Sequence, residues 1–515
     1  MQPVQLHVIH DWGGGAARWV EDYCRADRQR RNLVLKPVAD AAGIGRRLAL
    51  YEGSPAAAPV ASWELDPALV SSAVTHPRYH AVLREVLKTW GVEAVLVSSL
   101  IGHSLDALAT GLPTAVVLHD YYPFCPAIHI TYRDRREGSP GRVCQSCPPE
   151  RLAQCLARNE HHRFFRGLTP GEALAVRAQF VALAQAPPVT LVAPSPSVQR
   201  HLLALEPRLA GAKFRVIPHG MAVPEGNSPV STVPEGDSPI FAARKLGQSP
   251  ARKLGQSPAR LTAVVLGRLS PEKGLHLLKE TLPELARLCD VVLLGCGKPG
   301  RALARRGVRV IPDYDRVRLP ALLAELGADF GLLLSVVPET FSYTLTELIH
   351  CGVPPVAVNR GSFADRIEDG ATGFLIAPSK EDLLGKVRML SARPEWLAAV
   401  RRNFQQIEPR PLEAMVREYR ELLPLPRFSE RRRAVGLGAA VAGRLRDAAA
   451  PPAAAGDKTF EARVDEVYAA ARVKVACTPR LRPWQRPLVR LALAGGYGLA
   501  KLGCRLVGRR KSRAA

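Results

Sequence analysis

Short apolar runs alternate with longer amphipathic stretches along this chain, and the pattern occurs twice. Runs bounded by turn residues and separated by helical patterns indicate βαβ units, and therefore a parallel sheet. The sequence thus predicts two doubly wound α/β domains, over residues 1–219 and 261–425. In the first domain the apolar runs cover residues 5–10, 93–98, 114–119, 189–193 and 214–218. In the second they begin at Leu261, Val291, Val308, Asp329, Val353 and Gly373.

Residues 220–260 break this pattern. VPEGNSPV recurs there as VPEGDSPI, and ARKLGQSP is followed directly by a second copy. Segments rich in Pro, Gly and Ser bury too little apolar surface to offset the entropy of ordering, which favours a flexible linker. A repeat that binds a partner is the alternative, although two copies are too few for a solenoid. Two domains joined in this way place a ligand crevice between them, at the carboxyl ends of their strands.

The net charge of +24 predicts attraction to an anionic partner, and more than half of it lies near the C-terminus. Residues 426–515 carry 20 Lys and Arg but only 6 Asp and Glu. Within this tail, residues 482–513 have an apolar centre between basic residues, which predicts a helix lying on an anionic membrane surface. The alternative is a disordered basic tail, because three glycines weaken that helix. Aromatic residues make up only 6% of the chain and no readout module is visible, which argues against nucleic acid.

The sequence predicts a cytoplasmic location. MQPVQLHVIH at the N-terminus is typical of a first strand and lacks the basic region and apolar core of a signal peptide. No window approaches the roughly 18 uninterrupted apolar residues that a membrane span requires. The ten cysteines of such a chain are expected to be reduced thiols, apart from one cluster described below.

The first motif whose residues suit binding or catalysis is VPETFSYTLTELIHCG, which follows the apolar run at Asp329. Ser342 or Thr340 can cap a helix here, and the helix start around Tyr343, Thr344 and Leu345 suits a phosphate. Glu347 can accept two hydrogen bonds from a vicinal diol such as ribose, and Glu339 is expected to face the crevice. The alternative is that Glu347 is a solvated helix carboxylate and that Glu339 is a capping acid.

The second motif is GRLSPEKG, which follows the first strand of the second domain. Arg268 and Lys273 flank a tight turn through Ser270 and Pro271, so that both cations can face the same crevice. Two positive charges near a helix N-terminus suit a diphosphate and favour its departure, because negative charge builds on it as the bond breaks. Judged alone, the pair can equally be two surface cations.

The third motif is HDWGGGAARWVED, in which a glycine turn joins the first strand to a helix. Glycines at Gly14 and Gly15 allow a close approach of the backbone to phosphate or sugar, because no Cβ intervenes. The motif is neither a dinucleotide fingerprint nor a Walker A loop, which argues against dinucleotide oxidoreductases and P-loop NTPases.

Together, these motifs resemble the retaining glycosyltransferases of the GT-B fold, family 4. The resemblance covers about residues 1–425 apart from the linker, and it extends through CGVPPVAVNRGSFADRIEDGATGFL. It implies two Rossmann-like domains facing a central cleft: an N-terminal acceptor domain with an insertion at about 120–165 and a C-terminal nucleotide-sugar donor domain.

The resemblance also implies roles for individual residues. Arg268 and Lys273 are expected to hold the donor diphosphate, and Glu347 the nucleotide ribose. Gly14 and Gly15 are expected to line the diphosphate from the other domain. Glu339 and His119 are the expected catalytic residues, placed against the transferred sugar; the alternative for His119 is a satisfied histidine at a strand end.

Two positions depart from the family pattern. Ser342 replaces a glycine, and Asp365 stands where a glutamate is common, which affects the contacts to the donor sugar more than the fold. The resemblance further implies retention at the anomeric carbon and a reaction that requires no metal. No residue stands out as a covalent nucleophile, so attack by the acceptor hydroxyl on the front face is favoured as the diphosphate leaves. Electrostatic stabilisation is then expected to be the main catalytic effect.

Four cysteines fall within the predicted insertion, at Cys125, Cys144, Cys147 and Cys155. A C-x2-C pair flanked by two more cysteines can form a tetrahedral thiolate site for structural zinc or an iron–sulfur cluster. The spacing fits no standard zinc ribbon, so ordinary reduced thiols are the alternative.

The sequence therefore predicts a hexosyltransferase on the inner face of the cytoplasmic membrane, acting in cell-surface polysaccharide or lipopolysaccharide synthesis. Its substrates are expected to be a nucleotide diphosphate sugar and a carbohydrate or lipid-linked acceptor. The rivals are a nucleotide-sugar 2-epimerase or a phosphorylase of the same fold, and a non-catalytic protein that binds lipid or nucleic acid through its basic tail.

Overall fold

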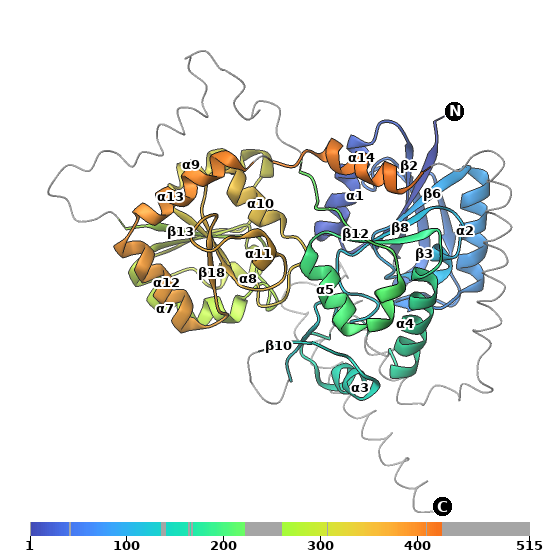
Figure 1. The fold of residues 1–515 in the computed structure, drawn as a ribbon, viewed down its shortest axis with the longest axis horizontal. Coiled ribbons are helices and arrows are strands. Elements are labelled where there is room, and N and C mark those ends of the chain that lie inside the picture. Colours follow the sequence, from blue (N-terminus) through green and yellow to red (C-terminus); the bar gives the residue numbers. More distant parts are fainter. Residues whose placement is uncertain are drawn as a thin grey trace, which may run out of the picture. The chain divides into compact units, whose positions relative to one another are not determined.

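The computed structural model describes residues 2–40, 43–134, 141–162, 165, 168–221, 260–305, 307–407 and 409–424. The predicted linker and basic tail lie outside the described residues, except at the ends of the linker. Two compact units are present (Figure 1). Unit 1 consists of Met1–Ala193, His201–Arg215 and the chain from Val416, and unit 2 consists of Pro194–Arg200 and Val216–Met415.

Unit 1 is built on an eight-stranded sheet with the order β12-β11-β8-β6-β1-β2-β3-β4. Every apolar run predicted for this half is a strand, and β1 pairs in parallel with both β2 and β6. The strands of the sheet are β1 (Val4–Val8), β2 (Arg31–Asp40), β3 (Gly43–Glu52), β4 (Ala61–Glu64), β6 (Val92–Val97), β8 (Thr114–Val117), β11 (Val189–Ala193) and β12 (Phe214–Val216). Short pairs are formed by β5 (Ser72–Ala73) with β7 (His103–Ser104) and by β9 (Thr131–Tyr132) with β10 (Arg142–Val143).

Three strands of the eight-stranded sheet, β2, β3 and β4, were not predicted, and their antiparallel pairs make the sheet mixed. β2 pairs with β3, and β3 with β4, in antiparallel fashion, which extends the parallel sheet at one edge. The segment RNLVLKPVAD of β2 mixes Lys, Pro and Asp with its apolar residues, so it has neither the continuous apolar run of a buried strand nor a clean alternation.

Helices cover the sheet of unit 1 (Figure 1). They are α1 (Gly14–Ala26), α2 (Pro77–Thr89), α3 (Pro149–Arg158), α4 (Pro170–Ala184), η1 (Leu105–Leu108) and η2 (Pro207–Gly211). Helices α5 (Pro196–Leu205) and α14 (Leu412–Leu422) contain residues of both units. In the described parts of the chain, no helix combines the length and hydrophobicity that crossing a bilayer demands.

Unit 2 contains a six-stranded sheet in the order β15-β14-β13-β16-β17-β18, and all its pairs are parallel. Its strands match the six predicted runs: β13 (Thr262–Leu266), β14 (Asp290–Leu294), β15 (Val308–Ile311), β16 (Phe330–Leu333), β17 (Pro355–Val358) and β18 (Phe374–Ile376). The helices are α7 (Leu275–Leu288), α8 (Gly297–Arg301), η3 (Arg316–Arg318), α9 (Leu319–Glu325), α10 (Tyr343–His350), α11 (Ser362–Arg366), α12 (Lys380–Ala392), α13 (Glu395–Asn403) and η4 (Phe404–Gln406).

The strands of this sheet are apolar on both faces because helices cover both faces. Val265 of β13 packs into a core with residues of α7, α12 and α13. Its neighbour Val264 points to the opposite face, into a core with residues of α9, α10 and α11. This explains why the strands appear in the sequence as continuous apolar runs.

The strand orders identify a switch point in each unit. In unit 2 the chain moves outward from β13 in one direction through β14 and in the other through β16, so the order reverses between β13 and β16. In unit 1 the reversal lies between β1 and β6. Ligands of open α/β sheets bind beyond the carboxyl ends of the strands at such points. GRLSPEKG follows β13, VPETFSYTL follows β16 and the glycine turn follows β1, so all three motifs stand at switch points.

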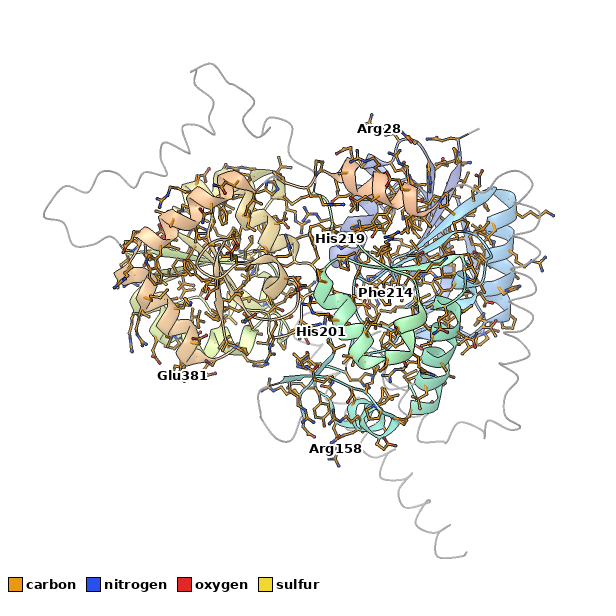
Figure 2. The ribbon with its side chains drawn as sticks, viewed as in Figure 1. Arg28, Arg158, His201, Phe214, His219 and Glu381 are labelled. Carbon is orange, nitrogen blue, oxygen red and sulfur yellow. The ribbon has the colours of Figure 1, made fainter. Side chains whose placement is uncertain are left out.

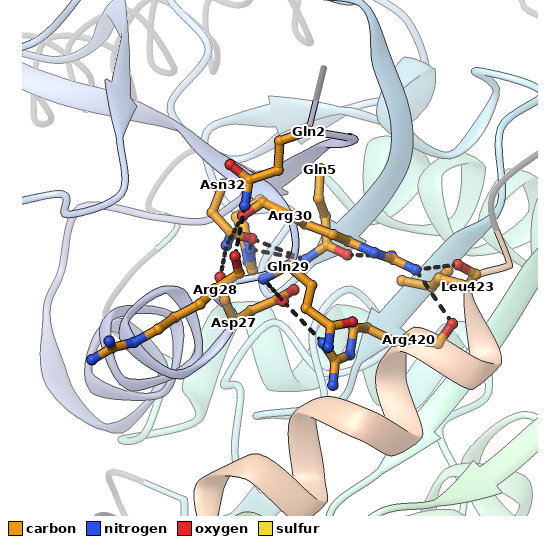
Figure 3. A network of polar contacts seen from close by, with 10 residues as sticks. Gln2, Gln5, Asp27, Arg28, Gln29, Arg30, Asn32, Arg420 and Leu423 are labelled. Carbon is orange, nitrogen blue, oxygen red and sulfur yellow. Dashed lines mark hydrogen bonds and ion pairs between the residues drawn. The ribbon is translucent and has the colours of Figure 1, made fainter.

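The end of helix α14 is held in unit 1 by a network of polar contacts around Arg30 (Figure 3). The buried Arg30 guanidinium donates hydrogen bonds to the carbonyl oxygens of Leu423 at 2.7 Å and Arg420 at 3.3 Å, and to Oε1 of Gln5 at 2.8 Å. Arg420 in turn lies 3.7 Å from Asp27. Because the last carbonyls of a helix lack partners within it, Arg30 supplies the donors that this end requires.

We expect Arg30→Ala to lower the free energy of unfolding by about 2 to 4 kcal/mol, because it leaves buried acceptors without donors. Urea titration followed by circular dichroism measures the change. Arg28→Ala is the matched control, since Arg28 projects from the edge of unit 1 (Figure 2) and enters the network only through its backbone carbonyl. Equal stability of the two variants would contradict the role of Arg30.

Two of the buried histidines of unit 1, His7 and His103, are neutral side chains. Nε2 of His103 donates to the carbonyl oxygen of Ile9 at 3.0 Å, which leaves Nδ1 to accept from the Tyr79 hydroxyl at 3.0 Å. His7 lies on β1, 3.0 Å from Asn32 Oδ1. Burial lowers the pKa of each imidazole to about 4.

These histidines predict a loss of stability in mild acid. At these two positions the unfolded chain takes up protons as the pH falls through about 6.5, but the folded chain does not until about pH 4. Their contribution is therefore fully present above pH 6.5 and is lost below it, by about 2 to 3 kcal/mol per pH unit for the two together. Urea midpoints between pH 7 and pH 4.5 measure this slope, and His103→Gln should reduce it. An unchanged slope in that variant would contradict the assignment.

Candidate functional site

The loop after β13 makes the predicted tight turn. The amide of Lys273 donates to the carbonyl of Ser270 at 3.0 Å, and the amide of Gly274 donates to that of Pro271 at 3.3 Å. Helix α7 begins directly afterwards, at Leu275. Arg268 and Lys273 are both exposed at this end of the sheet.

This turn packs tightly against the end of β16. The amide of Val336 donates to the carbonyl of Glu272 at 3.0 Å, and the Ser335 hydroxyl donates to the same oxygen at 3.2 Å. Gly274 has a φ of +81°, and a Cβ at this position would collide with the carbonyl of Leu334. Only glycine meets both requirements, so GRLSPEKG and the loop after β16 are fastened to one another.

Lys273 and Glu339 form an ion pair across these two loops. The distance from Nζ to Oε1 is 2.5 Å, and the Lys273 side chain is 49% exposed while that of Glu339 is 12% exposed. The backbone of Glu339 is fixed from the other side, because its carbonyl accepts from the Ser362 amide at 2.8 Å. A carboxylate and a cation thus face each other at the switch point.

Helix α10 begins beside the same loops. Ser342 caps it, because its Oγ accepts from the Leu345 amide at 3.3 Å. Ser342 has a φ of +67°, so its backbone is in the left-handed region that favours glycine. This agrees with the glycine that the family pattern has at this position. Thr344 lies against Gly267, where an added Cβ would come within 3.2 Å of its methyl group. The positive end of the helix dipole, with Tyr343, Thr344 and Leu345, therefore stands at the carboxyl end of β13.

Glu347 is buried in α10, and Oε1 lies 3.7 Å from Nε of Arg316, whose side chain is 55% exposed. Arg316 belongs to η3, after β15. Nothing in the local sequence sets Arg316 apart from the other arginines, so its place beside Glu347 could not be predicted. The interpretation of Glu347 as a solvated helix carboxylate is wrong, since the side chain is only 7% exposed.

A second arginine that the sequence analysis missed holds the start of α10. Arg366 donates to the carbonyl oxygens of Phe341 and Ser342, to the latter at 3.1 Å, and to the hydroxyl of Thr346 at 2.7 Å. Its guanidinium also lies 4.1 Å from the centre of the Phe341 ring. Burial lowers its pKa to about 10, so the side chain remains charged at neutral pH. Arg366 is a positioning residue for the helix start.

Asp365, the second departure from the family pattern, is already engaged within unit 2. Its carboxylate accepts from the backbone amide of Ser197 at 2.7 Å and from the guanidinium of Arg200 at 2.5 Å.

In unit 1, the glycine turn adopts the conformation that its sequence predicts. Gly13 and Gly14 have φ values of +70° and +78°, and a Cβ on either would meet no atom within 4 Å. Gly14 and Gly15 are exposed and form the first turn of α1, which contains no acidic residue. The helix start is therefore open and free of negative charge, as an anion requires.

His119 follows β8, two positions beyond its end. Its ring packs edge-on against Trp19 of α1, with centroids 5.2 Å apart. Burial lowers its pKa to about 3, with a smaller contribution from His10. A neutral imidazole can accept or donate a hydrogen bond to a sugar hydroxyl but does not act as a fixed cation.

The four cysteines of the predicted insertion line one cavity of about 390 Å³ in unit 1. All four are free thiols.

Comparison with known proteins finds a family match in the second unit. Residues 251–406 match the family model for glycosyl transferases group 1. These residues cover most of unit 2. The glycogen synthase of Thermus thermophilus is 33% identical over 173 residues, covering 30% of this chain and 37% of that protein. The glycogen synthase of Leptothrix cholodnii is 33% identical over 183 residues, covering 31% and 36%.

Solved structures also resemble the chain. HepE of Anabaena in complex with UDP and glucose aligns with 81% of this chain and 98% of its own, at 17% identity and a TM-score of 0.47. Sucrose-phosphate synthase of Thermosynechococcus elongatus aligns with 87% and 100%, at 14% identity and a TM-score of 0.49.

The group 1 match agrees with the predicted GT-B fold, and the two sheets confirm the prediction of two Rossmann-like units. The chain spans little more than a third of the length of the curated glycogen synthases it matches.

Substitution of Gly361 tests how the backbone of Glu339 is held in position. The φ of Gly361 is +57°, and a Cβ there would lie 2.5 Å from the carbonyl oxygen of Glu339. Gly370 is the matched control, because its φ is +81° but nothing lies within 4 Å of an added Cβ. We expect Gly370→Ala to cost about 1 to 2 kcal/mol of stability. Gly361→Ala should cost about 1 to 3 kcal/mol more, since Glu339 must move. Denaturant titration measures both, and equal costs would contradict this packing.

Proposed function

We propose that the chain is a retaining glycosyltransferase of family 4 that uses a nucleotide diphosphate sugar as donor. The observation that carries the proposal is the convergence of Lys273, Glu339 and the start of α10 at the switch point of unit 2. The group 1 match supports it, because that match covers all of these residues. The glycogen synthases that share 33% identity support a glycosyl-transfer reaction in general.

The diphosphate is assigned to Lys273, Arg268 and the N-terminus of α10, around Tyr343, Thr344 and Leu345. Phosphate oxygens at this position meet a helix dipole and two side-chain cations. As the bond to the sugar breaks, negative charge grows on the departing diphosphate, and preorganised cations stabilise that charge without reorganisation of the site. Lys273 is held in position by Glu339 before the donor binds, and we propose that it exchanges this carboxylate for a phosphate oxygen.

The ribose is assigned to Glu347 and the sugar to Glu339. A buried carboxylate that can accept from two neighbouring hydroxyls suits a ribose diol, and Oε1 of Glu347 lies 3.7 Å from Nε of Arg316. Glu339 borders the same loops, so its carboxylate can accept from the hydroxyls of the transferred sugar. In unit 1, Gly14 and Gly15 are assigned to the diphosphate, and the neutral His119 to the sugar.

Front-face attack by an acceptor hydroxyl is the mechanism we favour. The bond from the anomeric carbon to the diphosphate oxygen breaks, the acceptor oxygen bonds to the same face of that carbon, and its proton passes to the departing diphosphate. We further propose a carbohydrate or lipid-linked acceptor in cell-surface polysaccharide synthesis, on the cytoplasmic side of an anionic membrane. The support for the membrane is the net charge of residues 426–515, which lie outside the described residues.

Nucleotide binding by the full chain tests the donor site. We expect a nucleoside diphosphate from a panel of UDP, ADP and GDP to raise the melting temperature of the wild type by a few degrees. Lys273→Ala and Glu347→Ala should lose most of that shift, and Lys273→Ala should also lower the transfer rate by roughly 10²- to 10³-fold. The control is Lys279→Ala, an exposed lysine of α7 in the same unit. Equal shifts in all four proteins would contradict the proposed site.

Glu339→Ala separates the sugar from the diphosphate. Because this variant frees Lys273, it should respond to the nucleoside diphosphate at least as strongly as the wild type. It should gain nothing further from the corresponding nucleotide sugar, whereas the wild type should gain an additional shift. The same additional shift in the variant would exclude Glu339 as the sugar ligand.

A further inference from the structure

A separate cavity in unit 1 gathers sulfur atoms from three parts of the chain. Cys125 comes from the loop after β8, Cys144 and Cys147 follow β10, and Cys155 lies in α3. Figure 1 shows β10 and α3 close together, apart from the main sheet of unit 1. The proposed glycosyl transfer assigns no role to these cysteines.

Three of the four sulfur atoms accept hydrogen bonds from nitrogen. The Ile130 amide donates to Cys125 Sγ at 3.3 Å, Asn159 Nδ2 donates to Cys155 Sγ at 3.1 Å, and Arg177 donates to Cys147 Sγ at 3.1 Å. A neutral thiol is a weak acceptor, whereas a thiolate is a strong one. Donors placed on sulfur in this way are typical of the outer shell of a metal–thiolate centre.

The charges around the cavity suit a thiolate centre as well. Arg142 and Arg151 line the cavity, and Arg177 contacts Cys147. The described residues that line it include no Asp or Glu. A zinc ion held by four thiolates carries a net charge of about −2, and nearby arginines compensate such a charge.

The regular elements of the surrounding segment are short. Strands β9 and β10 have two residues each, and the buried residues of α3 are Leu152 and Cys155. Small substructures without a sizeable core commonly depend on a metal or on disulfides.

We propose that Cys125, Cys144, Cys147 and Cys155 bind one zinc ion that cross-links the loop after β8, the segment after β10 and helix α3. Zinc is assigned because it is redox-inactive and the proposed glycosyl transfer moves no electrons. Among the described residues, no group of three or more His, Cys, Asp or Glu side chains is already arranged to hold a metal ion. The sulfur atoms therefore turn toward the centre of the cavity on binding, and each thiol that binds gives up its proton.

The test uses the full chain, purified under reducing conditions from medium that contains zinc and iron. We expect elemental analysis to give one zinc per chain, and the cobalt-substituted protein to show sulfur-to-cobalt charge-transfer absorption. Alkylation should label the four cysteines only after a chelator removes the metal, and removal should lower the melting temperature.

Cys144→Ser and Cys147→Ser should lose most of the zinc, while Cys24→Ser, which alters a cysteine of α1 outside the cavity, should keep it. If the serine variants fail to fold, the metal content of the wild type still tests the proposal. Iron in place of zinc, no bound metal or a disulfide among the four cysteines would overturn the proposal. None of these readouts depends on glycosyl transfer, so the two proposals can fail separately.

Discussion

The contact between the turn after β13 and the end of β16 is the constraint on which the candidate donor site depends. Chain reversal at a switch point sends α7 to one face of the sheet and α10 to the other, so the two loops diverge. The hydrogen bond from Val336 to Glu272 and the glycine at Gly274 hold the loops together at their base. Lys273 and Glu339 therefore stand opposite one another at a distance set by backbone geometry.

The electrostatics of this region follow from that geometry. Arg268, Lys273 and the start of α10 bring positive charge or potential to one sheet edge, and the buried Arg366 adds a fixed charge beside the helix start. Glu339 and Glu347 balance part of this charge through Lys273 and Arg316. The balance holds the cations in place without a ligand and allows them to be redirected when an anion arrives. The Lys273 and Arg316 side chains are about half exposed, and water weakens an ion pair whose cation it reaches.

Much of this arrangement could be predicted from the sequence, because it depends on local patterns. Strands buried on both faces have continuous apolar runs, and Ser342 caps α10 as a serine before a helix should. The strands β2, β3 and β4 were missed, since their residues mix polar and apolar types. Arg316 and Arg366 could not be found either, because each acts on a residue at least 20 positions away, and only the fold shows which arginine among many reaches it.

The candidate donor site and the cysteine cavity are built on different structural elements. In unit 2 the site lies at the end of a sheet that has a core on each face, and this packing makes its loops rigid. The segment that carries Cys144, Cys147 and Cys155 contains the two-residue strands β9 and β10 and helix α3. A cross-link that joins this segment to the loop after β8 would fix it relative to β8, the strand that His119 follows. The proposed zinc site would thus support the strand ends of unit 1 and take no part in the chemistry proposed for unit 2.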